Sequence, residues 1–183
     1  MIATHDSITG EKPKNIWAYL GYPSAKTQSK TIKEQFEVGV RMYDLRCAYD
    51  NNGVLVMKHG LARFGGTLKE TLELLYSLAD IRNEMVYVLV TYEGELDDVR
   101  QFLGNVVSIV GMYNNVIQLM TVNVKLPTWN EVYRNKDCKA QFTQDYAKIV
   151  GWKKILPIPF VWWLFSRRKK QYMTDIFSMR DFV

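Results

Sequence analysis

The sequence predicts one α/β domain with a parallel sheet, spanning residues 1–183. Two features of the chain predict this fold class. Apolar runs of strand length alternate with helical patterns up to residue 136, and each helical pattern leads into another apolar run. A length of 183 residues, with 48% hydrophobic and 23% charged residues, suits one buried core of ordinary globular composition.

The elements are predicted in a recurring order of strand, helix and strand. The helix at 67–81 has the clearest signal, because Thr67 and Glu70 form a capping box and leucines follow at helical spacing. The run 84–94 is rich in β-branched residues, which is typical of a strand buried on both faces. The other predicted elements are strands at 2–5, 40–47, 54–60 and 114–121, helices at 29–39 and 95–111, a capped helical turn at 127–135, and a last strand at 175–183.

The composition limits the partners and the compartment. A net charge of +5 favours an anionic partner, such as a membrane surface, a nucleic acid or a phosphate ester. Two cysteines, Cys47 and Cys138, form neither a disulfide framework nor a zinc quartet. The chain begins without a signal peptide and has no apolar run of ~20 residues, which predicts a cytoplasmic or peripheral membrane location. A leader upstream of this chain would instead indicate secretion.

Polar residues gather where successive predicted strands end. They are His5 and Asp6, then Asp44 and Arg46, then His59. In parallel α/β proteins the carboxyl ends of the strands form the edge at which active sites assemble. Two imidazoles suit acid–base attack on a phosphate ester, and a guanidinium can hold the phosphate oxygens as negative charge builds. The set predicts phosphodiester chemistry that needs no metal and no other cofactor.

Three ordered blocks carry a resemblance to a known family. "ATHDS", "TIKEQFEVGVRMYDLR" and "VMKHGL" resemble the X-domain of the phosphatidylinositol-specific phospholipases C, in their bacterial calcium-independent form, over residues 2–93. The resemblance implies a (β/α)-barrel of TIM type. Because such barrels usually need ~250 residues, we expect this one to be shortened or irregular in its second half, where residues 137–174 have no clear pattern.

The resemblance also implies roles for the polar residues. His5 matches the general base that deprotonates the inositol 2-hydroxyl, and His59 matches the general acid that protonates the diacylglycerol oxygen. Arg46 matches the guanidinium that grips the phosphate, and Asp6 the carboxylate that orients the acid. Asp181, in "SMRDFV", matches the partner of the general base on the last strand, next to the first. The implied products are a cyclic inositol phosphate and diacylglycerol.

Four further residues are predicted to line the substrate pocket: Asp44, Lys58, Thr91 and Glu93. Each has a plain structural alternative or an open role. Asp44 could form an ion pair with Arg46, Lys58 could be a solvated charge, and Glu93 could open the next helix. Thr91 stands where the resemblance implies a lysine that holds the inositol ring, which leaves the head group open. The eukaryotic relatives bind calcium through acidic residues, whereas Arg46 would repel the cation.

The segment "PIPFVWWLFSRRKK" is predicted to contact a membrane. Aromatic side chains followed by four consecutive basic residues suit an anionic bilayer interface. A buried core segment or a subunit interface within an oligomer is the alternative. No nucleic-acid-binding motif is present, so a nucleic-acid partner is not expected. The predicted membrane-contact residues are Phe160, Trp162, Trp163 and Phe165.

Three alternatives to a phospholipase C-like enzyme stay open. A glycerophosphodiesterase-like enzyme would share the barrel but needs an acidic metal cluster, which Arg46 disfavours. A catalytically silent membrane-docking or structural module would need only the barrel and the aromatic segment. A nuclease of similar barrel type is the least favoured, and it would bind DNA in a strongly salt-dependent manner.

Overall fold

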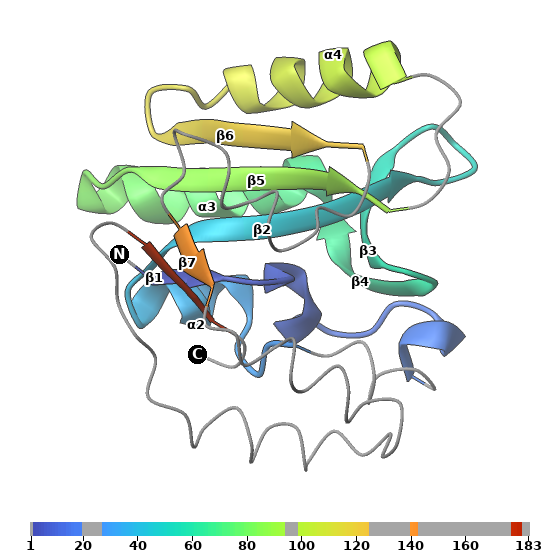
Figure 1. Ribbon diagram of the computed structural model, residues 1–183, viewed down its shortest axis with the longest axis horizontal. Helices are drawn as coiled ribbons and strands as arrows, with labels where there is room; N and C mark the ends of the chain where they lie inside the picture. The colour runs from blue at the N-terminus through green and yellow to red at the C-terminus, as the bar shows by residue number, and fades with distance from the viewer. Residues whose placement is uncertain (1, 20–26, 94–98, 125–139, 143–176, 181–183) are drawn as a thin grey trace.

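The structure is a computed structural model, and it describes residues 2–19, 27–93, 99–124, 140–142 and 177–180. The fold is α/β, as predicted, and its strands form one mixed sheet (Figure 1). The elements are β1 (Ile2–Thr4), the 3₁₀ helix η1 (Ser7–Gly10), α2 (Ile32–Glu37), β2 (Val40–Tyr49), β3 (Leu55–His59), β4 (Ala62–Thr67), α3 (Leu68–Arg82), β5 (Val86–Tyr92), α4 (Val99–Gly111), β6 (Ile117–Asn123), β7 (Ala140–Phe142) and β8 (Phe177–Arg180).

Six of the strands are parallel and follow the order β6, β5, β2, β1, β8 and β7. The prediction of a wholly parallel sheet is wrong for β3, which pairs with β2 in the antiparallel sense, and β4 was not predicted. The link between β2 and β3 is a tight turn around Gly53, which is too short for the crossover that a parallel pair needs. The hairpin β3–β4 therefore extends from the end of β2.

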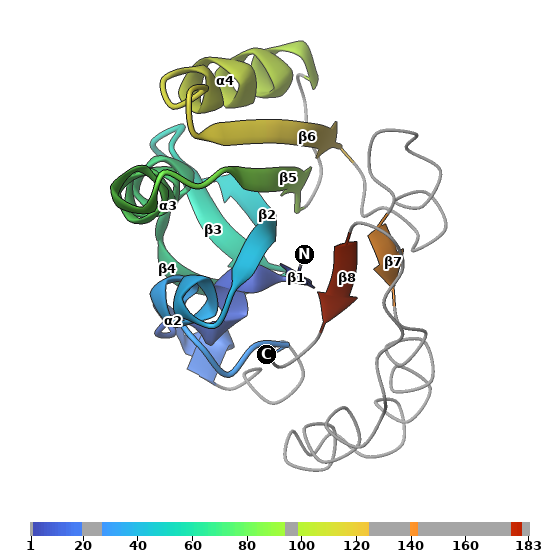
Figure 2. The ribbon, with the colours of Figure 1, turned by 90° about the vertical axis from the view of Figure 1, so that its left-hand side faces the viewer.

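The first strand lies between two others. Ala3 of β1 is in register with Met42 of β2 on one side and with Met179 of β8 on the other, and both pairs are parallel. The prediction of a last strand beside the first is confirmed, and Figure 2 shows β8 next to β1. Strands on both sides restrain a segment that begins at the second residue of the chain.

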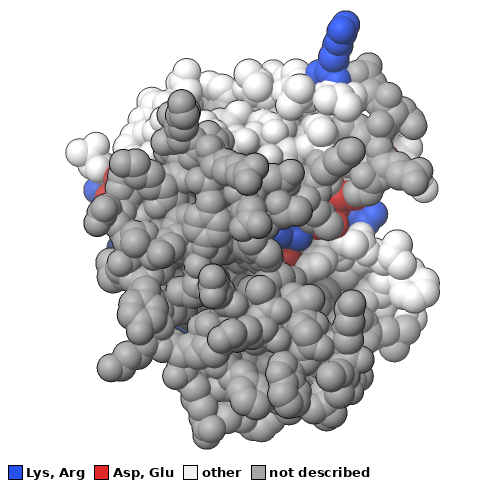
Figure 3. All heavy atoms as spheres, viewed as in Figure 1, with Lys and Arg blue, Asp and Glu red and all other residues white. Residues whose placement is uncertain are grey.

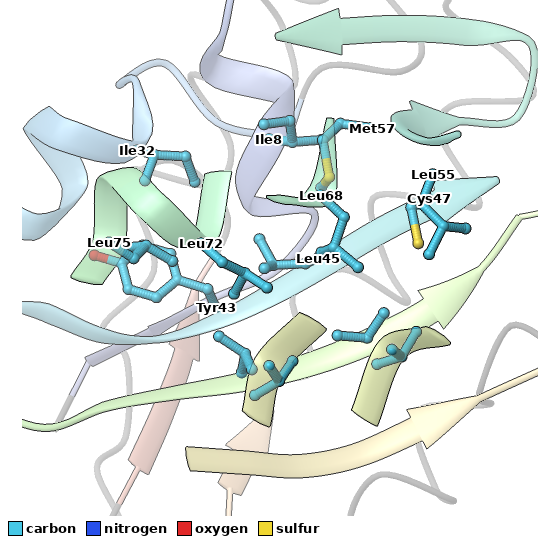
Figure 4. Packing of buried hydrophobic residues seen from close by; sticks show 14 of the residues in the cluster. Ile8, Ile32, Tyr43, Leu45, Cys47, Leu55, Met57, Leu68, Leu72 and Leu75 are labelled. Carbon is cyan, nitrogen blue, oxygen red and sulfur yellow. The ribbon is translucent and has the colours of Figure 1, made fainter. Parts of the chain in front are cut away.

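The two faces of the sheet differ in character. The outer face of β2 and β5 contributes Tyr43, Leu45, Val88 and Val90 to an apolar core beneath α3 and α4. Figure 4 labels Tyr43 and Leu45 within this core. Because side chains alternate along a strand, Asp44, Arg46 and Thr91 point to the opposite, inner face. Helix residues that complete the core include Leu68, Leu72, Leu75, Phe102 and Val106.

The helices begin where their caps place them. Thr67 accepts from the Glu70 backbone amide, and the Glu70 carboxylate accepts in return from the Thr67 amide, so the predicted capping box of α3 is confirmed. Thr31 and Glu34 form a second box at α2, which the sequence prediction missed. Among the described residues, no helix has both the length and the hydropathy to cross a membrane.

Candidate active site

The segment that carries His5 and Asp6 is held by its backbone. Gln28 Nε2 and Thr27 Oγ1 donate to the His5 carbonyl at 2.8 and 3.0 Å. Asp6 has a left-handed backbone, with φ of 47°, and its amide donates to Asp44 Oδ2 at 3.1 Å. A non-glycine residue in this conformation persists only where its surroundings fix it, and such residues cluster at functional sites.

Arg46, on the inner face of β2, lies at the centre of the site. Its Nε is 2.8 Å from Asp6 Oδ1 and 3.2 Å from Asp44 Oδ2, and its Nη1 is 3.1 Å from Glu93 Oε1. All four of these side chains are buried. The contacts with Asp44 and Glu93 are hydrogen bonds, and the contact with Asp6 is an ion pair. Two directional contacts fix the orientation of the buried guanidinium, and the carboxylates compensate its charge.

His5 contacts the same guanidinium from another direction. Arg46 Nη2 lies 2.7 Å from His5 Nε2. A guanidinium can only donate, so Nε2 accepts with its lone pair, and the proton of the neutral ring is on Nδ1. The unprotonated nitrogen of His5 is therefore Nε2, and the Arg46 guanidinium donates to its lone pair.

His59, at the end of β3, is held by the carboxylate of Asp6. Its Nδ1 is 2.5 Å from Asp6 Oδ2, and its side chain is 22% exposed. Burial disfavours the charged imidazole, but the negative charge of Asp6 and the hydrogen bond to it outweigh burial, so the pKa of His59 is raised. The His59 ring therefore stays protonated to higher pH than a free histidine. Because Nδ1 lies against Asp6, the N–H that remains for donation is at Nε2.

Asp6 stays ionised although it is fully buried. Burial alone would raise its pKa, but the nearby charges of Arg46 and His59 hold the pKa of this carboxyl well below its usual range. The same Asp6 Oδ2 lies 3.9 Å from His5 Nε2, so one carboxylate lies beside both imidazoles. The Arg46 guanidinium therefore lies against one imidazole, and the Asp6 carboxylate lies against the other.

Comparisons with solved structures match the fold of the chain to a known one. No family model and no curated protein sequence matches the chain. The phosphatidylinositol-specific phospholipase C from Listeria monocytogenes matches with a TM-score of 0.56 and 22% identity, over 67% of this chain and 50% of that chain. This protein has a phospholipase C fold.

Two structures of the Staphylococcus aureus phosphatidylinositol-specific phospholipase C agree with this assignment. One, from a study of membrane binding, has a TM-score of 0.54 and 17% identity, over 72% of this chain and 49% of that chain. The other, a mutant, has a TM-score of 0.52 and 17% identity, over 66% and 46%. These matches confirm the predicted resemblance for the fold. The chain spans about half the length of the structures that it matches.

Within this phospholipase C fold, the predicted site residues fall into three groups. His5, Asp6, Asp44, Arg46 and His59 come together, and Glu93 joins them through Arg46. Thr91 is next to Arg46 in strand register, whereas Lys58 alternates away from His59 and lies opposite Arg63 of β4. Asp181, Phe160, Trp162, Trp163 and Phe165 lie outside the described residues.

The sequence prediction missed several residues around this candidate site. Thr27 and Gln28 lie in a segment predicted only as a polar loop, yet they hold the backbone of His5. Thr121 and Asn123 of β6 are in register with Leu89 and Thr91 of β5, which places them on the inner face. The register shifts between Val88 and Leu89, so regular alternation along β6 does not predict which of its side chains lie on the inner face.

The described residues contain no group of three or more histidine, cysteine or acidic side chains arranged to hold a metal ion. Asp6, Asp44 and Glu93 surround a guanidinium instead. Figure 3 shows acidic and basic atoms side by side in a recess, on the side to which the arrowhead of β5 points in Figure 1. The recess therefore presents a charged patch at the edge of the sheet where the site lies.

Proposed function

We propose that the chain cleaves the phosphodiester of a phosphoinositide-like lipid by a metal-independent two-histidine mechanism, giving a cyclic phosphate and diacylglycerol. The observation that supports it best is the contrast between the two imidazoles. His5 Nε2 accepts from the Arg46 guanidinium, and His59 Nδ1 lies against the Asp6 carboxylate. Two imidazoles in one site, one against a guanidinium and the other against a carboxylate, suit the base and the acid of one reaction.

In the proposed reaction a head-group hydroxyl replaces Arg46 Nη2 as the hydrogen-bond donor to His5 Nε2, and this nitrogen then takes the hydroxyl proton. That oxygen attacks phosphorus and closes a cyclic phosphodiester. The bond between phosphorus and the diacylglycerol oxygen breaks, and His59 gives its proton to that oxygen. Arg46, fixed by three carboxylates, stabilises the charge that builds on the phosphate oxygens.

We propose that the head group contacts uncharged side chains on the inner face of β5 and β6. Thr91 Oγ1 is buried and has no hydrogen-bond partner among the described residues, which is unusual for a buried hydroxyl. Thr91 lies in register between Arg46 and Asn123. Hydroxyl and amide groups beside the phosphate-binding arginine suit the hydroxyls of an uncharged polyol.

We also propose that one catalytic domain spans residues 1–183 and that its sheet closes into a shortened barrel. The pairing of β1 with β8 supports this, because it joins the first strand of the chain to the last described strand. Closure would then require hydrogen bonds between the two sheet ends, β6 and β7.

An exposed apolar patch beside His59 supports peripheral membrane binding. Leu61 follows His59 by two residues, and Asn15 Nδ2 donates to its carbonyl at 2.9 Å, which ties the helical turn at 16–19 to the β3–β4 turn. Ile16, Trp17, Tyr19 and Leu61 are 54–67% exposed. Exposed aromatic and aliphatic side chains next to a site for a lipid suit insertion into a bilayer interface.

Vesicle binding tests this patch. We expect the double variant Trp17→Ala, Leu61→Ala to bind phosphatidylinositol vesicles about tenfold more weakly in a sedimentation assay, because two exposed apolar side chains are lost. The variant Trp162→Ala, Trp163→Ala tests the segment predicted from sequence. A loss confined to that second variant would assign membrane contact to residues 157–170 instead.

Cleavage assays test the proposed reaction. We expect wild-type protein in excess chelator to release cyclic inositol phosphate from phosphatidylinositol. His5→Ala and His59→Ala should each lose about 10²- to 10⁴-fold in turnover, the usual contribution of a positioned acid or base. Lys69→Ala, on the exposed side of α3, serves as a surface control with unchanged turnover. Circular dichroism checks that each variant is folded.

Two outcomes would replace this proposal with an alternative. No turnover on any phospholipid, with folded protein still bound to vesicles, would favour a silent membrane-docking module, for which the exposed patch is the supporting observation. Turnover that disappears with chelator and returns with a divalent cation would favour a glycerophosphodiesterase-like enzyme.

A further inference from the structure

Glu93 lies just after β5 and makes contacts in two directions. Its Oε1 is 3.1 Å from Arg46 Nη1, and its Oε2 accepts from the backbone amide of Gly60 at 3.1 Å. Its own amide donates to the Cys47 carbonyl at 2.8 Å. The residue is 6% exposed, and both of its carboxylate oxygens have partners within the protein.

Each of these contacts bears on a different catalytic group. Gly60 directly follows His59 in the turn between β3 and β4, and Arg46 is the proposed phosphate-binding residue. A buried carboxylate costs several kcal/mol unless it is paired and hydrogen-bonded. Glu93 meets that requirement only where the end of β5, the inner face of β2 and the β3–β4 turn come together.

We propose that Glu93 is a positioning residue that holds Arg46 and His59 in one rigid unit, so that the phosphate-binding group and the general acid keep a fixed separation. This inference rests on the proposed function. Asp6 and Asp44 fix Arg46 at Nε, whereas Glu93 fixes it at Nη1. Asp6 fixes the ring of His59, and Glu93 fixes the backbone next to it.

Glu93 can act through its negative charge and through the position of its two carboxylate oxygens, and these two effects can be tested separately. Its negative charge also favours the protonated form of His59, although less than Asp6 does. The charged and titratable groups that face this cluster come from four elements and their ends: His5 and Asp6 after β1, Asp44, Arg46 and Cys47 on β2, His59 on β3, and Glu93 itself after β5.

Two substitutions separate charge from geometry. Glu93→Asp keeps the charge but is one methylene too short to reach both partners, so kcat should fall about 10- to 100-fold while the titration of His59 stays near that of the wild type. Glu93→Gln removes the charge, so His59 should titrate at lower pH. Glu84→Gln, at the opposite end of β5 and paired with Arg41, is the matched control and should change neither property.

Nuclear magnetic resonance gives a readout that does not depend on turnover. The chain has only two histidines, so each ring can be followed through a pH titration, and hydrogen exchange of the Gly60 amide reports its contact with Glu93. We expect faster exchange at Gly60 in Glu93→Ala and Glu93→Asp. Unchanged exchange, or wild-type kcat in Glu93→Asp, would overturn the inference. Faster exchange with no turnover in wild-type protein would support the positioning contact and overturn the proposed function.

Discussion

The two histidines lie in contrasting parts of the molecule. His5 follows a strand with a neighbour on each side, is 2% exposed, and touches a cation. His59 ends a strand of an antiparallel hairpin, has a 22% exposed side chain, and touches an anion. The His5 segment is therefore specified by packing and backbone hydrogen bonds, whereas the His59 segment depends on two carboxylates, Asp6 and Glu93, from outside its hairpin.

This contrast continues into the backbone that follows each histidine. After His5 the chain forms η1, and Gly10 at its end packs against the carbonyl of Lys30. After His59 the chain turns at Gly60, where an added Cβ would have no neighbour within 4 Å in the part of the chain that the structure describes. The first segment should therefore tolerate no added atoms, and the second should tolerate them at a modest cost in strain.

Gly10→Ala tests the packed segment and should have the largest effect. An added Cβ would lie 1.8 Å from the Lys30 carbonyl oxygen, which is backbone and cannot move aside on its own. We expect a loss of about 3 kcal/mol in the free energy of unfolding, which is the upper part of the range for overpacking. Urea denaturation measures it. A change within about 0.5 kcal/mol would show that η1 is loosely packed, contrary to the contrast drawn here.

Asp6→Asn tests the dependence of the acid on a carboxylate. Asparagine fits the left-handed backbone at this position, so the fold should survive. Because the carboxylate raises the pKa of His59, its loss should move the alkaline limb of the kcat/KM profile to lower pH. We expect kcat/KM to fall about 10²-fold at pH 7. A pH–rate profile measures both effects.

Asp6 and His59 also make the free energy of unfolding depend on pH, each in a defined direction. Asp6 has a lowered pKa in the folded state, so its contribution is present above its ordinary range and is lost as pH falls through the folded value. His59 has a raised pKa, so its contribution is complete below about pH 6.5 and is lost as pH rises through the folded value. Asp6→Asn should weaken both dependences. Thermal unfolding with unaltered pH dependence in the variant would contradict this account.

Much of the site could be predicted from sequence because parallel strands bring their carboxyl ends to one edge. His5, Asp44 and Arg46 follow this rule. His59 does not follow the rule, because its strand is antiparallel to β2. It nevertheless lies at the same edge, where it contacts Asp6. The partners of Glu93 could not be predicted, since they depend on how the hairpin folds back toward β5. Asn123 was missed because the predicted strand ended at residue 121, whereas β6 continues to Asn123.

Gly60→Ala tests the open segment and should have the smallest effect on stability. Gly60 has φ of +56°, and an added Cβ would meet nothing within 4 Å. A left-handed alanine costs about 1–2 kcal/mol, and we expect a loss of about 1 kcal/mol in urea denaturation. Gly53, in the turn between β2 and β3, has φ of +73° and equally open surroundings, so Gly53→Ala should lose a similar amount.

The two glycine variants should differ in turnover. Gly60 adjoins His59 and donates its amide to Glu93, so strain there should displace the general acid and lower kcat several-fold. Gly53 has no such link, and its variant should keep the wild-type kcat. Equal losses of kcat in both variants would mean that the hairpin responds as a whole, and the acid would then depend on the stability of the hairpin rather than on its contact with β5.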